Sequence, residues 1–320
     1  MQWLETQNFL MNTVVEQKVC GEDPLSAAQK AVAEILRLES LLSFFDANSD
    51  VSRINQAAGR EAVRISGETM MILQAALSCS EASKGAFDIT LAPTIDLWRR
   101  CGEKGSIPSQ EAIEAALSAS GYHNLELDTE SCSAYLRKQG CMIDLGAIGK
   151  GYAADRCIEV YKSFGVRSAF VNLGGNVKTI GTSPAGKPWS IGIQHPDKPR
   201  GVFFGALESI DQSVVTSGAY ERYFEAGGCK YHHIIDALTG QPSTSGLKSV
   251  TVVCPHSMLA DCLSTAAFVM GLDEGLSLIR DHNEAGALFV TENNSIYLTK
   301  NLISQFKLQP NSGLDCYVVE

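Results

Sequence analysis

The sequence is short of positive charge. Its 320 residues include 26 lysines and arginines against 36 aspartates and glutamates, which gives a net charge of −10. Nonspecific binding to nucleic acid or to an anionic lipid surface requires clustered lysine and arginine. We therefore predict that the protein binds neither nucleic acid nor membrane. If its ligand is an anion, local positive charge or a metal ion must hold it.

Long apolar runs and cysteine pairs are also missing. No stretch of about 18 apolar residues occurs, so we expect no transmembrane helix. Residues 1–5 show neither the basic nor the apolar segment of a secretory signal. The ten cysteines form no C-x-x-C pair and lie mostly in apolar segments, which is typical of buried, reduced thiols. Together these absences predict a cytoplasmic protein.

The composition is that of a globular protein, with 45% apolar and 19% charged residues. The length allows two ordinary domains or one large one. We interpret residues 1–320 as one unit, built as a single body or as two closely packed subdomains with a soft boundary near residues 181–188.

Apolar periodicity and capping residues predict helices and strands in mixed order. The predicted helices cover residues 24–43, 66–83, 109–119, 148–164, 258–270 and 273–282. The predicted strands cover residues 141–144, 168–173, 189–194, 202–207, 231–235, 249–254, 286–291 and 295–299. Helices and strands interleave with several hairpins, which favours an α+β fold of mixed, largely antiparallel sheets with flanking helices.

The apolar helix at 258–270 carries polar groups on one face. Asp261 and Thr265 are four residues apart, with Ser264 beside them, so their oxygens lie together. A carboxylate in apolar surroundings is costly unless it is paired or bound to a metal. Asp261 either caps or salt-bridges a neighbour, or it belongs to a Mg²⁺ site, since carboxylate and hydroxyl oxygens suit that ion.

The segment IDLGAIGKGY, residues 143–152, leads through a glycine turn into a predicted helix. Exposed amide groups and the helix dipole at such a start suit a phosphate, and Lys150 adds positive charge. The segment is neither a Walker A loop nor a dinucleotide fingerprint. Spacing alone leaves two interpretations open: a phosphate site or a plain connection from strand to helix.

Histidines and cysteines gather in the second half of the chain without a standard zinc spacing. Cys229, His232, His233 and Asp236 lie close in sequence, but they match no usual ligand pattern. His233 lies at the end of a strand-like run, Tyr231–Ile235, before a turn. It is either a structural histidine or a general base near the proposed metal.

Further segments accompany these motifs. They are SDVSRIN at 49–55, GAFDIT at 85–90 with Pro93 and Trp98, DLGAIGKGYAAD at 144–155, NLGG at 172–175, TSGAYER at 216–222, HIID at 233–236 with Thr239 and Gly240, and ADCLST at 260–265. In this order they resemble one family, the FAD:protein FMN transferases of the ApbE type, over residues 11–279.

The resemblance implies an ApbE-like fold and a specific reaction. The FMN moiety of FAD, the substrate, would pass with the help of Mg²⁺ to a Thr or Ser hydroxyl of a target flavoprotein. A phosphoester bond would form and AMP would leave.

The resemblance also implies a site, position by position. The metal would be held by the Ala147 carbonyl, Asp261 and Thr265, with Ser264 adjacent. His233 would take the proton of the acceptor hydroxyl, and Lys150 would supply positive charge. The FAD site would be lined by Met11, Phe45, Ala86, Phe87, Asp88, Asp144, Lys150 and Ile235.

Three positions depart from the family pattern. Phe45 stands where a tyrosine is usual, so a ring remains but the phenol hydrogen bond is lost. Asn12 replaces the glycine of an N-terminal Met-Gly-Thr, and Ala237 replaces a proline in the turn after His233.

Two alternatives to transfer stay open: an FAD pyrophosphatase that yields FMN and AMP, and a non-catalytic FAD-binding protein. For a transferase, we expect the acceptor to be a soluble cytoplasmic reductase with an FMN-attachment Thr or Ser.

Overall fold

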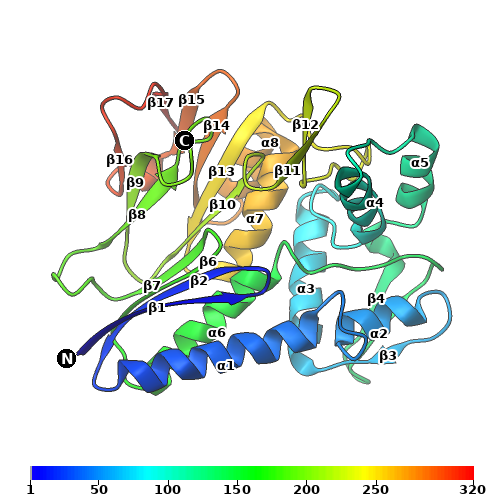
Figure 1. Cartoon of the computed structure of the whole chain (residues 1–320), viewed down its shortest axis with the longest axis horizontal. Coiled ribbons are helices and arrows are strands. Elements are labelled where there is room, and N and C mark those ends of the chain that lie inside the picture. Colours follow the sequence, from blue (N-terminus) through cyan, green and yellow to red (C-terminus); the bar gives the residue numbers. More distant parts are fainter. Residues whose placement is uncertain (1) are drawn as a thin grey trace.

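The computed structural model describes residues 2–320 and is organised around one large sheet (Figure 1). Its nine strands follow the order β1-β2-β6-β7-β10-β13-β14-β15-β17, and only the last pair is parallel. The strands are β1 Gln2–Leu10, β2 Thr13–Gly21, β6 Ser168–Leu173, β7 Asn176–Ile180, β10 Ser213–Gly218, β13 Leu247–Cys254, β14 Gly286–Thr291, β15 Ser295–Thr299 and β17 Asp315–Val319.

Helices and a small sheet cover the two faces of this large sheet. On one face, apolar side chains of α1 Pro24–Leu42, α3 Gly67–Ala82, α6 Gly149–Ser163, α7 Ser257–Met270 and α8 Leu272–Arg280 form the main core. On the other face lies a three-stranded sheet of β8 Trp189–Gln194, β9 Phe203–Ser209 and β16 Phe306–Leu308, with its own apolar cluster. The result is a layered α+β structure.

A further group of elements lies to the right of α3 and above it in Figure 1. It comprises α2 Asp50–Ala57, α4 Ala92–Glu103, α5 Gln110–Ser118, the short sheet of β3 Val63–Arg64, β5 Ser133–Leu136 and β4 Leu125–Asp128, and the hairpin of β11 Tyr223–Ala226 and β12 Cys229–His232. Trp98 of α4 stacks on Tyr231 of this hairpin at 5.4 Å. Short 3₁₀ turns occur at Tyr122–Asn124 and Lys300–Leu302.

The predicted α+β class and largely antiparallel pairing are confirmed, and the six predicted helices are present with small shifts at their ends. The strand predicted at 141–144 is wrong. Met142 makes a single bridge to Leu91 and the Asp144 amide donates to the Ile89 carbonyl, but no strand forms because the Asn55 side chain takes both backbone groups of Ile143. The strand predicted at 231–235 also ends early, at His232, and Ile235 makes one bridge to Pro242.

Several elements were not predicted, among them the β1–β2 hairpin, α2 and α4. Residues 181–188 form the connection from β7 to β8. The division into two subdomains there stays a prediction.

All ten cysteines are free, and six are buried, as predicted for reduced thiols. Burial raises the pKa of the Cys141 and Cys254 thiols to about 11 in each case. Within residues 2–320, no helix combines the length and the apolar character that crossing a bilayer requires.

Candidate active site

The starts of helices α6 and α7 meet at Asp261. Only 4% of this residue is exposed, and its Oδ2 accepts a hydrogen bond of 2.9 Å from the Gly151 amide. The Lys150 ammonium lies 3.7 Å from the same oxygen. Gly151 permits this approach, since a Cβ there would lie 2.4 Å from the Ser257 carbonyl oxygen. The carboxylate is therefore held between a helix amide and a lysine.

The Ala147 carbonyl lies just before helix α6 and is available as an acceptor. The helix begins at Gly149, so the Gly151 amide is one of the first amides, which have no carbonyl partner within a helix. It is bound instead by the Asp261 side chain. The Ala147 oxygen accepts no backbone hydrogen bond within residues 2–320.

Hydroxyl groups gather on the same face of α7. Ser217 of β10 places its Oγ 2.9 Å from Ser264 Oγ and 3.1 Å from Thr265 Oγ1. The sequence predicted Ser264 and Thr265 as neighbours but missed Ser217, which comes from a strand 47 residues away along the chain. Its position in the TSGAYER segment was the one available signal.

These oxygens fit a hard divalent cation. Asp261 Oδ1 accepts no hydrogen bond in the described part of the chain, and it is not among the fully buried oxygens that lack a partner. With the Ala147 carbonyl and the Thr265 hydroxyl, the donors are all oxygens, as Mg²⁺ prefers. Among residues 2–320, no group of three His, Cys, Asp or Glu side chains is placed to hold a metal ion.

In the first turn of α6, the Gly149 amide donates to the Leu145 carbonyl at 2.7 Å and the Gly151 amide donates to Asp261, while the Lys150 amide donates to no group of residues 2–320. The helix starts at Gly149, and the preceding Ile148 provides no side-chain cap. Lys150 Nζ donates to the Gly146 carbonyl at 2.6 Å, and Asp144 Oδ1 accepts from the Gly146 amide at 2.6 Å. An uncapped helix start with an adjacent lysine is suited to an anion.

Asn55 fixes the segment that leads into this helix. Its Oδ1 accepts from the Ile143 amide at 2.7 Å, and its Nδ2 donates to the Ile143 carbonyl at 2.9 Å. On the next residue, the Asp144 amide donates to the Ile89 carbonyl at 2.8 Å. Sequence reasoning placed Asn55 in a motif but found no role for it, because its partner lies 88 residues away.

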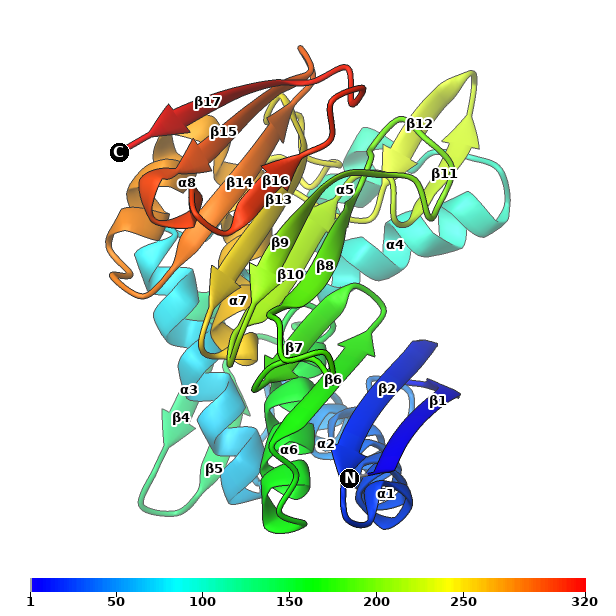
Figure 2. The same ribbon diagram turned by 90° about the vertical axis from the view of Figure 1, so that its left-hand side faces the viewer.

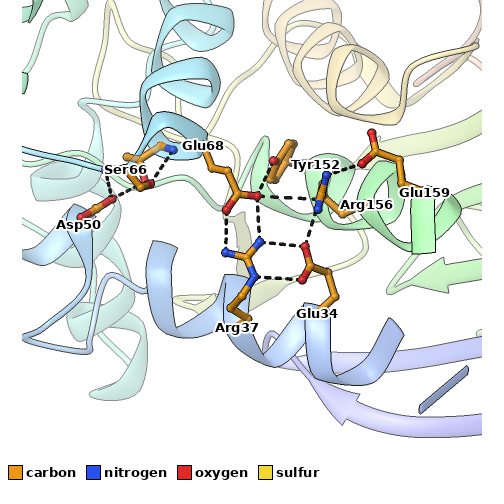
Figure 3. Close-up of polar contacts among 9 residues, drawn as sticks. Glu34, Arg37, Asp50, Ser66, Glu68, Tyr152, Arg156 and Glu159 are labelled. Carbon is orange, nitrogen blue, oxygen red and sulfur yellow. Dashed lines mark hydrogen bonds and ion pairs between the residues drawn. The ribbon is translucent and has the colours of Figure 1, made fainter. Parts of the chain in front are cut away.

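A network of ion pairs ties α6 to α1 and α3 (Figure 3). Arg37 of α1 pairs with Glu34 at 2.8 Å and with Glu68 of α3 at 2.6 Å. Tyr152 of α6 donates to Glu68 at 2.8 Å, and Arg156 contacts Glu34 at 3.0 Å. Hydrogen bonds from Arg37 lower the pKa of Glu34 to about 2. The network holds the helix that carries Lys150.

The loop of residues 85–91 uses its acidic side chain internally. Asp88 accepts hydrogen bonds from the Thr90 amide at 2.7 Å and the Tyr122 amide at 2.9 Å, while burial raises its pKa. Phe87 is 2% exposed and belongs to the main core. Contacts of Ala86, Phe87 and Asp88 with FAD stay predictions.

His233 lies beside this helix start, on the turn after β12. Its Nδ1 is 3.1 Å from the Arg222 carbonyl oxygen, which selects the tautomer with the proton on Nδ1 and the lone pair on Nε2. The His233 residue is exposed to solvent, but nearby protein atoms displace water from around its ring. This desolvation, reinforced by the positive charges of Arg222 and Lys150, lowers the pKa of His233 to about 4.

The turn after His233 keeps its shape without the proline of the family pattern. The Gly240 amide donates to the Asp236 carbonyl at 2.8 Å, and the Asp236 amide donates to the Gln241 carbonyl at 2.8 Å. Trp98 Nε1 fixes the turn from outside by donating to the Gly240 carbonyl at 2.7 Å. Ala237 therefore does not open the loop.

The turn between β1 and β2 reaches the same place. Met11 and Asn12 both have positive φ, 48° and 56°, which makes a two-residue type I′ turn. Asn tolerates this conformation, so it can replace the glycine of the family pattern. The Met11 methyl lies 3.8 Å from where a Cβ on Gly149 would be, and Arg222 Nη2 donates to the Asn12 carbonyl at 3.3 Å.

The structure thus brings together most of the residues predicted for the site. Asp261, Ser264, Thr265 and Lys150 form one cluster, and the Ala147 carbonyl precedes the helix that carries Lys150. Asp144 is bound to the Gly146 amide and Met11 lies beside Gly149, while Arg222 joins His233 to the turn after Met11. The other predicted residues have no direct contact with this cluster. Phe45 is 78% exposed and touches Phe44 edge to face, Ile235 is buried beside Trp98 and Ile113, and residues 86–88 form the separate loop described above.

A sequence model of the ApbE family matches residues 11–289. The chain belongs to the ApbE family. A curated FAD:protein FMN transferase of Klebsiella pneumoniae is 37% identical over 290 residues, covering 91% of this chain and 90% of the relative. One of Treponema pallidum is 31% identical over 321 residues, covering 94% and 88%.

Solved structures of this family share the fold. The ApbE protein of Thermotoga maritima superimposes with a TM-score of 0.85 at 35% identity, covering 94% of this chain and 98% of that one. The flavin transferase ApbE of Vibrio cholerae has a TM-score of 0.83 at 24% identity, which supports the fold alone. The predicted ApbE-like fold is confirmed.

Proposed function

We propose that this chain is an FAD:protein FMN transferase that uses Mg²⁺ and releases AMP. The observation that carries the proposal is the contact of Asp261 with the start of α6. Its Oδ2 accepts from the Gly151 amide and lies 3.7 Å from the Lys150 ammonium, on the helix face that also carries Thr265. The curated relatives with this activity support the reaction class.

The cluster would hold the diphosphate of FAD through charge. Asp261, Thr265 and the Ala147 carbonyl would bind Mg²⁺, which supplies charge neutralisation on the phosphates when bound. The Lys150 ammonium and the Lys150 amide at the start of α6 would contact the phosphate oxygens. The local positive charge thereby offsets the acidic net charge of the chain.

His233 would act as the base in the transfer step. The acceptor hydroxyl oxygen attacks the phosphorus on the FMN side, the bond to the bridging oxygen breaks, and AMP leaves with that oxygen. The hydroxyl proton passes to Nε2, the nitrogen left free by the Nδ1 contact with the Arg222 carbonyl. With a pKa near 4, the free ring is neutral at pH 7 and able to accept it.

Met11, Phe45 and Asp144, with the 86–88 loop and Ile235, stay predictions as contacts of the flavin nucleotide. Met11 has the clearest support, because a non-glycine residue at positive φ is held beside Gly149. The exposed Phe45 ring is available for stacking on a flavin.

We further propose that the acceptor is a cytoplasmic flavoprotein, such as a soluble reductase with an FMN-attachment Thr or Ser. The ten free cysteines support a reducing compartment. Coexpression with such a reductase tests this partner, and a reductase that stays without covalent flavin counts against it.

The reaction is tested by incubating the protein with FAD, Mg²⁺ and a candidate acceptor domain, followed by mass spectrometry of the acceptor. We expect an FMN mass increment that His233→Ala removes and His282→Ala keeps. His282, in the turn after α8, is a matched control for loss of an imidazole. Free FMN and AMP without an adduct would indicate a pyrophosphatase, and bound, uncut FAD would indicate a flavin-binding protein.

A further inference from the structure

Strand β1 is a free edge of the large sheet. It pairs with β2 on one side, and no other described strand lies on its outer side, as Figure 2 shows at the right of the sheet. Its nine residues contain no lysine, arginine or proline, and Glu5 is the one charged residue. Natural edge strands usually carry such residues to prevent pairing, so a long unguarded edge suits an added strand.

The register shows which backbone groups face outward. The type I′ turn makes Leu10 and Thr13 a hydrogen-bonded pair, so Phe9 and Val14 form the next, non-bonded pair. Val14 accordingly directs its carbonyl away from β1, to the Gly174 amide at 3.2 Å. By the same alternation, the outward amides and carbonyls of β1 belong to Trp3, Glu5, Gln7 and Phe9.

The outer edge ends at the candidate active site. Phe9 is two residues before Met11, whose methyl lies beside Gly149, and Arg222 joins the Asn12 carbonyl to the turn of His233. The far end of the strand is fixed by stacking of Trp3 on Trp189 at 5.9 Å. A chain that pairs along β1 is therefore led toward His233.

An apolar pair stands at the site end of this edge. Phe9 is 70% exposed and faces Val14, 48% exposed, across the strand pair. Cross-strand neighbours of this kind give specificity to an added strand, whose backbone bonds alone are tolerant of sequence.

We propose that β1 is the docking edge for the acceptor protein, where an extended acceptor segment pairs as an added strand and brings its Thr or Ser hydroxyl to His233. We choose the acceptor as the partner because it is the one macromolecular substrate of the proposed reaction, and its hydroxyl must reach His233 at this end of β1. The inference rests on the proposed function.

The test compares Gln7→Pro with Gln7→Ala. Proline at position 7 removes an outward amide and breaks no bond to β2, while alanine keeps the amide and removes the same side chain. Loss of one or two pairing bonds should lower kcat/KM for the acceptor roughly ten-fold in Gln7→Pro alone. FAD affinity, measured by flavin fluorescence, should be equal in the two variants.

Equal kcat/KM for the two variants would overturn the docking edge. If wild type itself forms no adduct, the proposed function fails instead, so the two failures are distinguishable. A dimer by light scattering that Gln7→Pro dissociates without changing acceptor kinetics would assign the edge to a second copy of the chain, and would also overturn the inference.

A second measurement does not depend on how well Gln7→Pro folds. Hydrogen exchange of wild-type protein is followed with an acceptor domain whose target Thr is replaced by Val. We expect slower exchange over residues 2–10 when the domain is added. Unchanged exchange there at saturating acceptor would contradict strand addition.

Discussion

Gly151→Ala tests the contact on which the site is built. A Cβ at this position would lie 2.4 Å from the Ser257 carbonyl oxygen and 2.7 Å from the Met258 Cα. Ordinary contact needs about 3.4 Å, so the start of α6 must move about 1 Å from the start of α7. The atoms met are backbone, so no side chain can rotate away to make room.

This shift should affect stability and activity together. Overpacking of a tight contact typically costs about 1–3 kcal/mol. The 2.9 Å bond from the Gly151 amide to Asp261 would stretch, and the separation of Lys150 and Asp261 would change with it. A misplacement of about 1 Å can cost roughly 10²-fold in rate. We therefore expect a large loss of FMN transfer even at temperatures where the variant is folded.

The assays are chemical unfolding and single-turnover FMN transfer followed by mass spectrometry. Gly67→Ala is the control, since Gly67 opens α3 with no atom within 4 Å of an added Cβ and without positive φ. It should keep wild-type stability and rate. A Gly151→Ala protein as stable and as active as wild type would refute the close contact between α6 and α7.

Three further predictions follow from the same geometry. Asn55→Ala should weaken FAD binding at least several-fold and lower stability by about 1–3 kcal/mol, since it leaves two backbone groups of Ile143 unpaired; unchanged FAD affinity by fluorescence titration would contradict this. Asp261→Ala should abolish Mg²⁺ binding in calorimetry and transfer together; retained metal affinity would exclude Asp261 as a ligand. Activity should also depend on pH. The His233 ring must be neutral to accept a proton, so activity should fall as the pH decreases through its pKa. In the pH profile of kcat/KM, which reports the free enzyme, the loss of activity should be centred near pH 4, the lowered pKa of His233. In the profile of kcat, the negative diphosphate of bound FAD should raise this pKa. The same acidic loss in wild type and His233→Gln would show that the histidine takes no part in the reaction.

The sequence predicted what depends on local pattern. The helix at 258–270 and the shared face of Asp261 and Thr265 follow from a period of 3.6 residues. The prediction of a strand at 141–144 was wrong because an apolar run does not show which segment its backbone will pair with. There the Asn55 side chain takes the place of a neighbouring strand. The β1–β2 hairpin was missed because β1 buries only Leu10 among its nine residues, so its apolar pattern is weak.

The remaining parts of the site depend on distant contacts. Ser217 contacts Ser264 and Thr265 only because β10 packs on α7. The Gly151 amide reaches Asp261 only because α6 also packs on α7. No spacing within the chain encodes the bond from the Gly151 amide to Asp261. Ala147 as a metal ligand follows from the resemblance and stays a prediction.

The most direct test of the account is the stoichiometry of transfer. An acceptor domain is incubated with wild-type protein, FAD and Mg²⁺, and both FMN-modified acceptor and released AMP are quantified over one time course. The account predicts one AMP for each FMN-modified acceptor, with both products absent for His233→Ala. Release of AMP without acceptor modification, or modification that continues at the wild-type rate in His233→Ala, would contradict it.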